Sequence, residues 1–418
     1  MTGAMYAAVS GLKSHMNALN VIGNNISNVN TLGYKAGRYT FSESLYTSSR
    51  SGSDGTTSIG GRNPAQVGYG CSIGTIDLDM STKNYTPTGY GLDTMIDGDG
   101  FFMVGDKTKL GVTDQTTLQG MKLTRLGALG FDSQGWMVDN NGNVVYGFMR
   151  MTTPDAVYNN QELDEETGKP TDPEAYQTAD DVPETALTSP VLTGLRYPNC
   201  VLYTNPDTGN TETIIVWPRM MNGQVVDPKD MNELKEWLEE DDYAAQYDPK
   251  DLAILTGEVD DLGWTDAPEL TFERLQPDTV SIDEKSGAIT VVTADEKVFV
   301  IGYLAIAKVD NPNGVTHVDG RYYQALGGAG NVHLTSVGGA IQFVPGDNAD
   351  WIYGGNYMDL TVKSSGGTNL VTGGLESSGT DLATEISNMV VIQRGYQANT
   401  RIVTVTDSML EELVNMKR

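Results

Sequence analysis

Two short groups of acidic and amide side chains beside a glycine have the composition of a calcium-binding loop. They are Asp97, Asp99 and Gly100, and then Asp139, Asn141 and Gly142. Such a loop combines oxygen ligands with a glycine at its sharp bend, but it also needs a glutamate at its twelfth position. Counting from Asp139 places Arg150 there. We therefore interpret both groups as turns and predict no metal site.

A second candidate for chemistry is the segment GYGCSIG, from Gly68 to Gly74, which has the glycine content of a phosphate-binding loop. It lacks the Lys-Ser/Thr ending of such a loop, and no helical pattern follows it. Cys71, inside the segment, would act as a nucleophile only with a histidine and an acid close by. The three histidines, His15, His317 and His333, are scattered along the chain. We predict no catalytic group and no cofactor, and therefore a protein that is not an enzyme.

The composition narrows the class of protein further. The formal net charge of -28 argues against nucleic acid as a partner. Cys71 and Cys200 are far apart and show no metal-ligand spacing, so a disulfide framework is not expected. No apolar run approaches the length of a membrane span, and the N-terminus lacks the basic start and apolar core of a secretory signal. These features by themselves predict a cytoplasmic protein without membrane insertion.

The element that would organise the rest of the chain is a long helix near the C-terminus, from about residue 380 to 416. Polar residues interrupt its apolar stripe at regular layers, Ser378 and Asp381 supply a capping start, and Lys417 and Arg418 place positive charge at the end of the dipole. At 1.5 Å per residue this helix is about 55 Å long, more than a small domain can cover. The stripe is formed by Leu382, Ile386, Met389, Tyr396, Val403, Leu410 and Val414.

A matching helix is predicted near the other end of the chain, from about residue 4 to 27. Gly23 weakens it, but the same alternation of three- and four-residue steps is present. Stripes this narrow are typical of coiled coils, so we expect the two terminal helices to pair. The alternative, packing of both on an ordinary globular core, is disfavoured because tens of strand-like residues separate each from other helical patterns. The stripe of this helix is formed by Val9, Leu12, Met16, Leu19 and Ile26.

Between the helices the chain is mainly β-type, so the predicted fold class is a mainly β multidomain protein with α-helical termini. We expect a terminal helical coiled-coil domain over residues 1–35 and 375–418, and an extended connector over 36–75. A discontinuous inner β domain should comprise 76–150 and 280–374. Its segment from Lys297 to Val309 is apolar on both faces, which is typical of a central strand.

Residues 151–279 form an acidic insert, which we expect to be a separate β-rich outer domain. It holds 29 Asp and Glu against 7 Lys and Arg, a net charge of -22. Most such carboxylates are interpreted as a solvated surface. One helix is predicted after Asp227, which would cap it, with Pro228 in its first position. Met231, Leu234 and Leu238 would form its apolar face.

The end of the first helix carries a distinctive polar motif, NNISNVNTLGYK, from Asn24 to Lys35. It resembles the signature of bacterial flagellar axial proteins, the rod and hook family, in which an amphipathic terminal helix ends in an NNIANVNTxGFK-like motif. Ser27 and Tyr34 replace the alanine and phenylalanine of that pattern. The closing stretch resembles the C-terminal signature of the family, with VIQRGYQAN and LVNMKR. The matching positions are Asn24, Asn25, Asn28, Asn30, Thr31, Gly33, Tyr34, Lys35, Gln393, Arg394, Tyr396 and Asn399.

The resemblance covers roughly residues 1–150 and 280–418 and implies a structural subunit of the flagellar hook. Such subunits polymerise into a curved helical tube that acts as a universal joint, with the paired terminal helices lining its inside. The implied partners are other copies of the chain, the rod, hook cap and hook-filament junction proteins, and the flagellar type III export apparatus. The implied location is extracellular, reached without a cleaved signal peptide.

Two alternatives remain. Within the family, a distal rod subunit of the basal body would have similar termini, although rod proteins generally lack an outer domain of this size. From a different class, a calcium-dependent surface adhesin or a surface enzyme would have similar strands. The paired terminal seams argue against the adhesin and the surface enzyme. A self-assembling filament subunit needs seams of this kind, which one small core cannot cover.

Overall fold

A computed structural model describes residues 2–52, 54, 60–108, 115–151, 192–206, 208–221, 224–239, 241–244, 247–259, 264, 267–337, 363–364 and 368–416. The Pro-rich run of the insert and the basic residues Lys417 and Arg418 lie outside these residues. The chain divides into two compact units. Unit 1 comprises Met1–Lys83 and Ser377–Arg418, and unit 2 comprises Asn84–Glu376.

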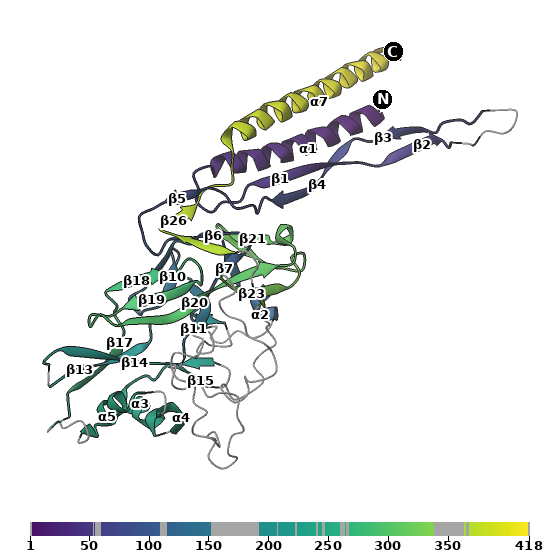
Figure 1. Cartoon of the computed structure of the whole chain (residues 1–418). Helices are drawn as coiled ribbons and strands as arrows, with labels where there is room; N and C mark the ends of the chain where they lie inside the picture. The colour runs from purple at the N-terminus through teal and green to yellow at the C-terminus, as the bar shows by residue number, and fades with distance from the viewer. Residues whose placement is uncertain are drawn as a thin grey trace. The chain divides into compact units, whose positions relative to one another are not determined.

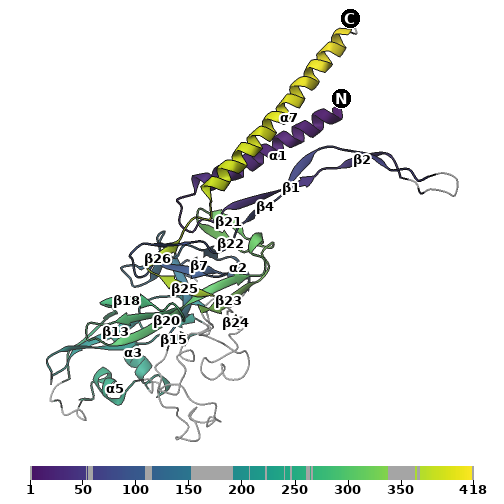
Figure 2. The same cartoon turned by 45° about the horizontal axis from the view of Figure 1, so that its top comes forward.

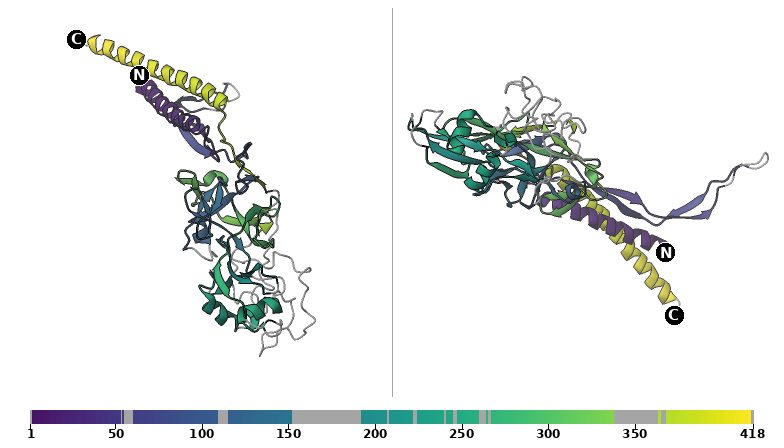
Figure 3. Two further views of the ribbon diagram at one scale, coloured as in Figure 1. Left: turned by 90° about the vertical axis from the view of Figure 1, so that its left-hand side faces the viewer. Right: turned by 90° about the horizontal axis from the view of Figure 1, so that it is seen from below.

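Unit 1 is built on two helices from opposite ends of the chain. Helix α1 spans Thr2–Ser27 without a break at Gly23, and helix α7 spans Leu382–Met416. The helices lie side by side and antiparallel, so that both chain ends are found at the same end of the pair (Figures 1 and 3). Asp381 accepts a hydrogen bond from the amide of Ala383 and starts α7. The predicted pairing of the terminal helices is therefore confirmed.

A long antiparallel ribbon packs beside α1 (Figure 2). Strand β1 (Gly37–Glu43) pairs with β4 (Cys71–Leu78), and β2 (Tyr46–Arg50) pairs with β3 (Ala65–Gly68). The sequence predicted an extended connector over residues 36–75, partly because Ser, Gly and Thr are abundant from Thr47 to Arg62. The extended strands are also paired, because each backbone amide and carbonyl gains a partner when the segment folds back on itself.

Unit 2 contains a 13-stranded sheet, which we call the large sheet. Strand β20 (Val298–Val309) is central, pairing with four neighbours, and its buried run confirms the prediction of a central strand. The main path runs through β18 (Thr279–Ile282), β19 (Ala288–Val292), β20, β11 (Val144–Met149), β7 (Phe101–Gly105), β8 (Lys122–Thr124), β22 (Tyr322–Gln324) and β21 (Thr316–Asp319). The remaining strands are β9 (Leu129–Phe131), β10 (Met137–Asp139), β12 (Thr193–Gly194), β23 (Val332–Ser336) and β24 (Lys363–Ser364).

Smaller elements complete this part of unit 2. Two short antiparallel ladders pair strands from the beginning of unit 2 with strands from its end. Strand β5 (Tyr85–Pro87) pairs with β26 (Gly374–Glu376), and β6 (Thr94–Asp97) pairs with β25 (Asn369–Thr372). Helix α2 spans Gln115–Gln119, and the 3-10 helix η5 spans Pro312–Gly314.

A second group of elements within unit 2 comes from the insert, and we call residues 199–274 the subdomain. Its sheet has the order β14 (Thr211–Val216), β13 (Asn199–Thr204), β17 (Leu270–Arg274), with a hairpin of β15 (Arg219–Met221) and β16 (Gln224–Val226). Helices α3 (Met231–Leu238), α4 (Asp241–Ala244) and α5 (Pro249–Thr256) follow in sequence. Asn199 pairs with Arg274, so the subdomain begins and ends at neighbouring positions.

Helix α3 differs from its prediction at its start. Asp230, not Asp227, caps the helix, and its carboxylate accepts hydrogen bonds from the amides of Asn232 and Glu233. The predicted apolar face is otherwise present, with Leu234 and Leu238 buried. Asp227 is not available for capping because it binds two arginines, described below.

Candidate assembly site

The seam between α1 and α7 is lined mainly by small side chains. A Cβ atom at Gly11 would lie 2.7 Å from Nδ2 of Asn399, and one at Gly395 would lie 2.9 Å from the ring of His15. Glycine therefore lets the two helix backbones approach closely at these points. The buried positions of α1 are Ala8, Gly11, Ser14, Ala18, Ile22 and Asn25, and the least exposed positions of α7 include Met389, Ile392, Gly395, Asn399, Val403 and Thr406.

The bulky residues of the two predicted stripes mostly flank this seam. On α1, Met16 is exposed, whereas Val9, Leu12, Leu19 and Ile26 are half-buried. On α7, only Met389 and Val403 of the predicted set are half-buried, and the exposed members are Leu382, Ile386, Tyr396, Leu410 and Val414. Leu19, Ile26 and Met389 of the predicted stripes pack against a small core of Ala18, Ile22 and Ile392, whereas the exposed members lie beside the contact. Their part in a contact between subunits stays a prediction.

Helix α7 exposes many more apolar side chains than the predicted stripe contains. An apolar surface of this length on one helix is typical of a protein interaction site. We call this set the exposed α7 surface: Leu382, Ile386, Val390, Val391, Tyr396, Ile402, Val405, Met409, Leu410, Leu413, Val414 and Met416.

Asn25, from the family motif, ties together the ends of three elements. Its Oδ1 accepts a hydrogen bond from the amide of Gly37 at 2.9 Å, and its Nδ2 donates to the carbonyl of Gly37 at 2.8 Å. The same Nδ2 donates to Oε1 of Glu385 on α7 at 3.0 Å, and Tyr34 donates its hydroxyl proton to Oδ1 at 3.1 Å. One buried amide thus joins α1, β1 and the first turn of α7.

The turn after α1 is held by the other polar residues of the motif. Asn28 donates from Nδ2 to the carbonyl of Asn24 at 2.9 Å, and Thr31 donates to Oδ1 of Asn28 at 3.1 Å. Gly33 has a positive φ of 71°, which explains a glycine at this position of the turn. Ser378 donates to the carbonyl of Asn28 at 2.8 Å and so fastens the segment that leads into α7.

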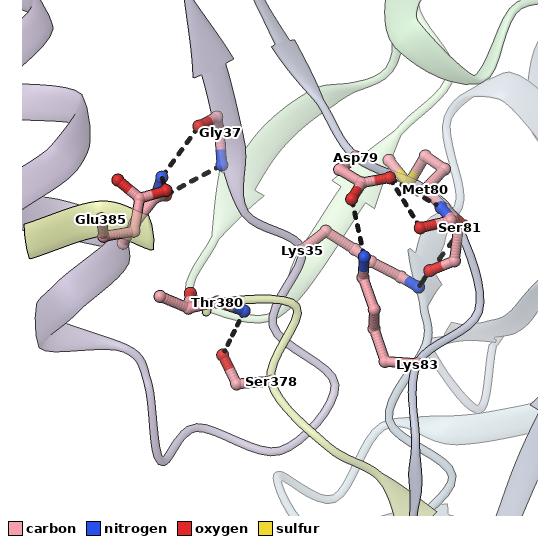
Figure 4. A network of polar contacts seen from close by, with 10 residues as sticks. Lys35, Gly37, Asp79, Met80, Ser81, Lys83, Ser378, Thr380 and Glu385 are labelled. Carbon is pink, nitrogen blue, oxygen red and sulfur yellow. Dashed lines mark hydrogen bonds and ion pairs between the residues drawn. The ribbon is translucent and has the colours of Figure 1, made fainter. Parts of the chain in front are cut away.

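Lys35 ends the motif and is fully buried. Its ammonium donates to the carbonyl of Ser81 at 2.9 Å and reaches that of Met80 at 3.4 Å (Figure 4). Close by, Lys83 and Asp79 form an ion pair of 2.7 Å. Partial burial raises the pKa of the Asp79 carboxyl, but hydrogen bonds from Lys83 and Ser81 outweigh it and hold the pKa at about 2. Lys35, at the end of the motif, therefore holds the segment that follows β4 beside the turn after α1.

The remaining motif residues have a different environment. Asn30 is exposed, as are Gln393 and Arg394 on α7, and Tyr396 belongs to the exposed α7 surface. Sequence reasoning did not identify the partners Gly37, Met80, Ser81 and Glu385, because they contribute mostly backbone groups or lie far along the chain.

Replacing Asn25 with alanine is expected to destabilise unit 1 by about 2 kcal/mol, because it leaves half-buried polar groups of Gly37 and Glu385 without this partner. Exchange of the Gly37 amide and the denaturant midpoint of helix loss would both report the effect. The matched variant is Asn24→Ala, which removes an exposed amide bonded to Tyr34 at 3.2 Å. A similar loss of stability in both variants would contradict the role assigned to Asn25.

The groups with the composition of calcium loops are occupied by protein side chains. Asp139 accepts hydrogen bonds through Oδ1 from the amides of Asn141 and Asn143, both at 2.9 Å, as a turn residue does. In the other group, the guanidinium of Arg125 donates to the carbonyls of Gly98 and Gly100 at 2.8 Å. Among the described residues, no cluster of three His, Cys, Asp or Glu side chains is placed to hold a metal ion.

The remaining candidates for chemistry are the two cysteines and His15. Cys71 is in β4, where its carbonyl accepts a hydrogen bond from Ser14 at 3.0 Å. Cys200 is buried in β13, and burial raises the pKa of its thiol to about 12, which disfavours the thiolate. His15 packs edge-on against Phe41. In the part of the chain that the structure describes, no helix has both the length and the apolar character of a membrane span.

Two sequence families match this chain, one at each end. The family described as "Flagella basal body rod protein" matches residues 5–35, which comprise most of α1 and the motif after it. The family described as "Flagellar basal body rod FlgEFG protein C-terminal" matches residues 371–416, which include all of α7. Both matches fall on the helix pair and its junction.

Individual relatives extend the similarity beyond the ends. The chain is 26% identical to the flagellar hook protein FlgE of Borreliella burgdorferi, over 100% of both chains. It is 25% identical to the flagellar basal-body rod protein FlgG of Bacillus subtilis, again over 100% of both. It is 25% identical to FlgE of Salmonella typhimurium, over 98% of this chain and 99% of that one.

A solved structure, that of the Helicobacter pylori flagellar hook protein FlgE2, is 10% identical and covers 59% of this chain and 95% of that chain, with a TM-score of 0.25. No conclusion is drawn from a likeness of that size. The matches at both termini and the full-length relatives agree with the helix pair and the motif described above. The chain is therefore similar to flagellar rod and hook proteins at both ends and over its full length.

Proposed function

We propose that this chain is a structural subunit of the flagellar hook, which self-assembles into a curved helical tube. The single observation that carries the proposal is the exposed α7 surface, which α1 leaves uncovered along the whole helix. Burial of apolar area contributes about 25 cal/mol per Å², so a second copy of the chain that covered this surface would gain substantial free energy. Contacts of this kind that do not close on themselves produce a helical polymer.

A rod subunit of the basal body is the second candidate. The full-length similarity to the FlgG rod protein of Bacillus subtilis favours it specifically. The subdomain, with its own apolar core around Leu234, Trp237 and Ile254, favours the hook, since rod proteins generally lack an outer domain of this size.

The further partners and the location follow from this proposal. A hook subunit would contact the rod at one end of the tube, and the hook cap and hook-filament junction proteins at the other. It would reach the outside of the cell through the flagellar type III export apparatus.

Electron microscopy of the concentrated, purified protein tests the proposal directly. We expect curved tubes, and we expect the gene to restore hooks in cells that lack their hook subunit. Rescue of cells that lack the distal rod subunit, with straight and short assemblies, would favour the rod. A protein that stays monomeric at high concentration and restores neither structure would refute both.

The last turns of α7 are expected to become ordered on assembly. Residues 407–416 are all exposed in the subunit, so their helical hydrogen bonds are open to water. We expect their amides to exchange at least ~100-fold more slowly in tubes than in the monomer. Amides near Ile392, which is buried against Ala18 and Ile22, serve as the internal control and should differ much less. Equal exchange of residues 407–416 in both states would contradict a role in assembly.

A further inference from the structure

A cluster of three charged side chains lies where the subdomain meets the large sheet. Oδ2 of Asp227 lies 2.8 Å from Nε of Arg196 and 2.8 Å from Nη1 of Arg274. The side chains of Arg196 and Asp227 are 5% and 10% exposed, and that of Arg274 is 32% exposed. One carboxylate oxygen thus serves two guanidinium groups in a mostly buried site.

The three residues come from both sides of the boundary. Arg196 belongs to the large-sheet side, because it forms a β-bridge with Trp136 and its guanidinium lies 4.9 Å from the centre of that indole ring. Asp227 and Arg274 belong to the subdomain. Asp227 lies in the segment before α3, and Arg274 is the last residue of β17. Arg274 also donates to the carbonyl of Tyr197 at 2.7 Å.

Apolar contacts join the same two parts. Cys200, Ile215 and Trp217 of the subdomain share a core with Ile289 and Leu304 of the large sheet. The hydrophobic effect is not directional, so this core holds the parts together without setting one orientation. Charged contacts depend on geometry, so the ion pair of Arg196 with Asp227, together with the hydrogen bond from Nη2 of Arg196 to the carbonyl of Val225 at 3.3 Å, favours one orientation.

We infer that Asp227 locks the subdomain to the large sheet in one orientation, so that the two parts move as one body. Without its negative charge, Arg196 and Arg274 would face each other with no ion-pair partner among the described residues, and the joint would open while the subdomain stayed folded. If the chain is a hook subunit, as proposed above, the lock determines how the subdomain is presented on the tube.

Hydrogen exchange on the full-length monomer tests the lock in the variant Asp227→Asn. Two amides at the joint report on its opening without bonding to Asp227. That of Tyr197, in the segment that leads into the subdomain, donates to the carbonyl of Gly135 at 2.8 Å, and that of Thr213, inside the subdomain, donates across the joint to Oδ2 of Asp295 at 3.2 Å. Both should exchange at least ~10-fold faster in the variant. The amide of Leu255, buried inside the subdomain, should keep its rate.

Two outcomes would overturn the inference. Unchanged exchange at Tyr197 and Thr213 would mean that the apolar core alone holds the joint. Equal acceleration at Leu255 would mean that Asp227 supports the folding of the subdomain and not its attachment. Because the monomer is measured, neither outcome depends on whether tubes form, and failure of the hook proposal would be seen separately by microscopy.

Matched variants separate the lock from general effects of the substitution. Asp230→Asn makes the same chemical change three residues later, at the cap of α3, and should accelerate only the first amides of that helix. Adding Arg274→Gln to Asp227→Asn returns the site to one positive charge and should bring the rates at Tyr197 and Thr213 to within ~3-fold of the original. If Asp227→Asn does not fold, Arg196→Gln removes the ion pair that crosses the boundary, and unchanged exchange at the joint amides there would likewise refute the lock.

Discussion

Replacing Leu410 with aspartate should abolish tube formation and leave the folding of the subunit intact. Leu410 lies on the exposed α7 surface and is 36% exposed in the subunit, so the free monomer tolerates a charge there. In a tube, the same position would bury an unpaired carboxylate against a neighbouring copy, at a cost of about 3 kcal/mol or more. The critical concentration for assembly should rise by about 100-fold. Sedimentation and electron microscopy across a concentration series would measure it.

The control is Ser408→Asp, which adds the same charge two residues earlier and about 200° around the helix. Ser408 is exposed and polar, and it donates to the carbonyl of Thr404 at 3.1 Å. We expect this variant to assemble within a few-fold of the original concentration. Loss of the thermal transition of unit 2 in Leu410→Asp, or normal tubes from it, would show that the exposed α7 surface is not an assembly contact.

Replacing Glu376 with glutamine should destabilise unit 2 by about 3 kcal/mol. Oε2 of Glu376 lies 3.5 Å from Nε of Arg125, with the two side chains 1% and 2% exposed. Burial lowers the pKa of the Arg125 guanidinium, and the charge of Glu376 opposes that shift. Glutamine keeps the shape and removes the counter-charge, so a buried cation would be left with the carbonyls of Gly98 and Gly100 alone as described acceptors. Urea unfolding of unit 2 would measure the loss.

The comparison variant is Lys250→Gln, which removes an ion pair with Glu212 of 3.8 Å at the surface of the same unit. Exposed pairs of this kind contribute about 0.5 kcal/mol. If Glu376→Gln costs no more than this variant, the buried pair does not hold the end of β26 in place, and the described contacts overstate its role.

Local patterns were sufficient to predict the helices and the central strand. An apolar side chain every three or four residues specifies a helix wherever its partner lies, which is why α1 and α7 were found within a few residues of their bounds. In the same way, β20 is apolar on both of its faces, and this pattern specified a strand buried on both sides. The polar turn after α1 was predicted because Asn and Gly favour the backbone conformations that it uses.

The partners of each charged or polar side chain depended on the folded chain. Asp227 has the position and type of a helix cap, but two arginines, 31 residues before it and 47 residues after it in the sequence, outcompete the helix for its carboxylate, and Asp230 takes over the cap. Lys35 ends a polar motif and would be expected at the surface. It is buried because backbone carbonyls of Met80 and Ser81 converge on its ammonium.

The face that each terminal helix presents to the other was also decided in three dimensions. Hydrophobic periodicity counts large side chains, and it selected the stripes that contain Met16 and Leu410. The helices instead approach closely at Gly11 and Gly395, which carry little weight in such a pattern, and they bury Ala18, Ile22 and Ile392 between them. The amino-acid pattern therefore established that two amphipathic helices exist and need partners. Steric fit between the two helices determined which side of each helix is buried inside the subunit and which apolar side remains exposed.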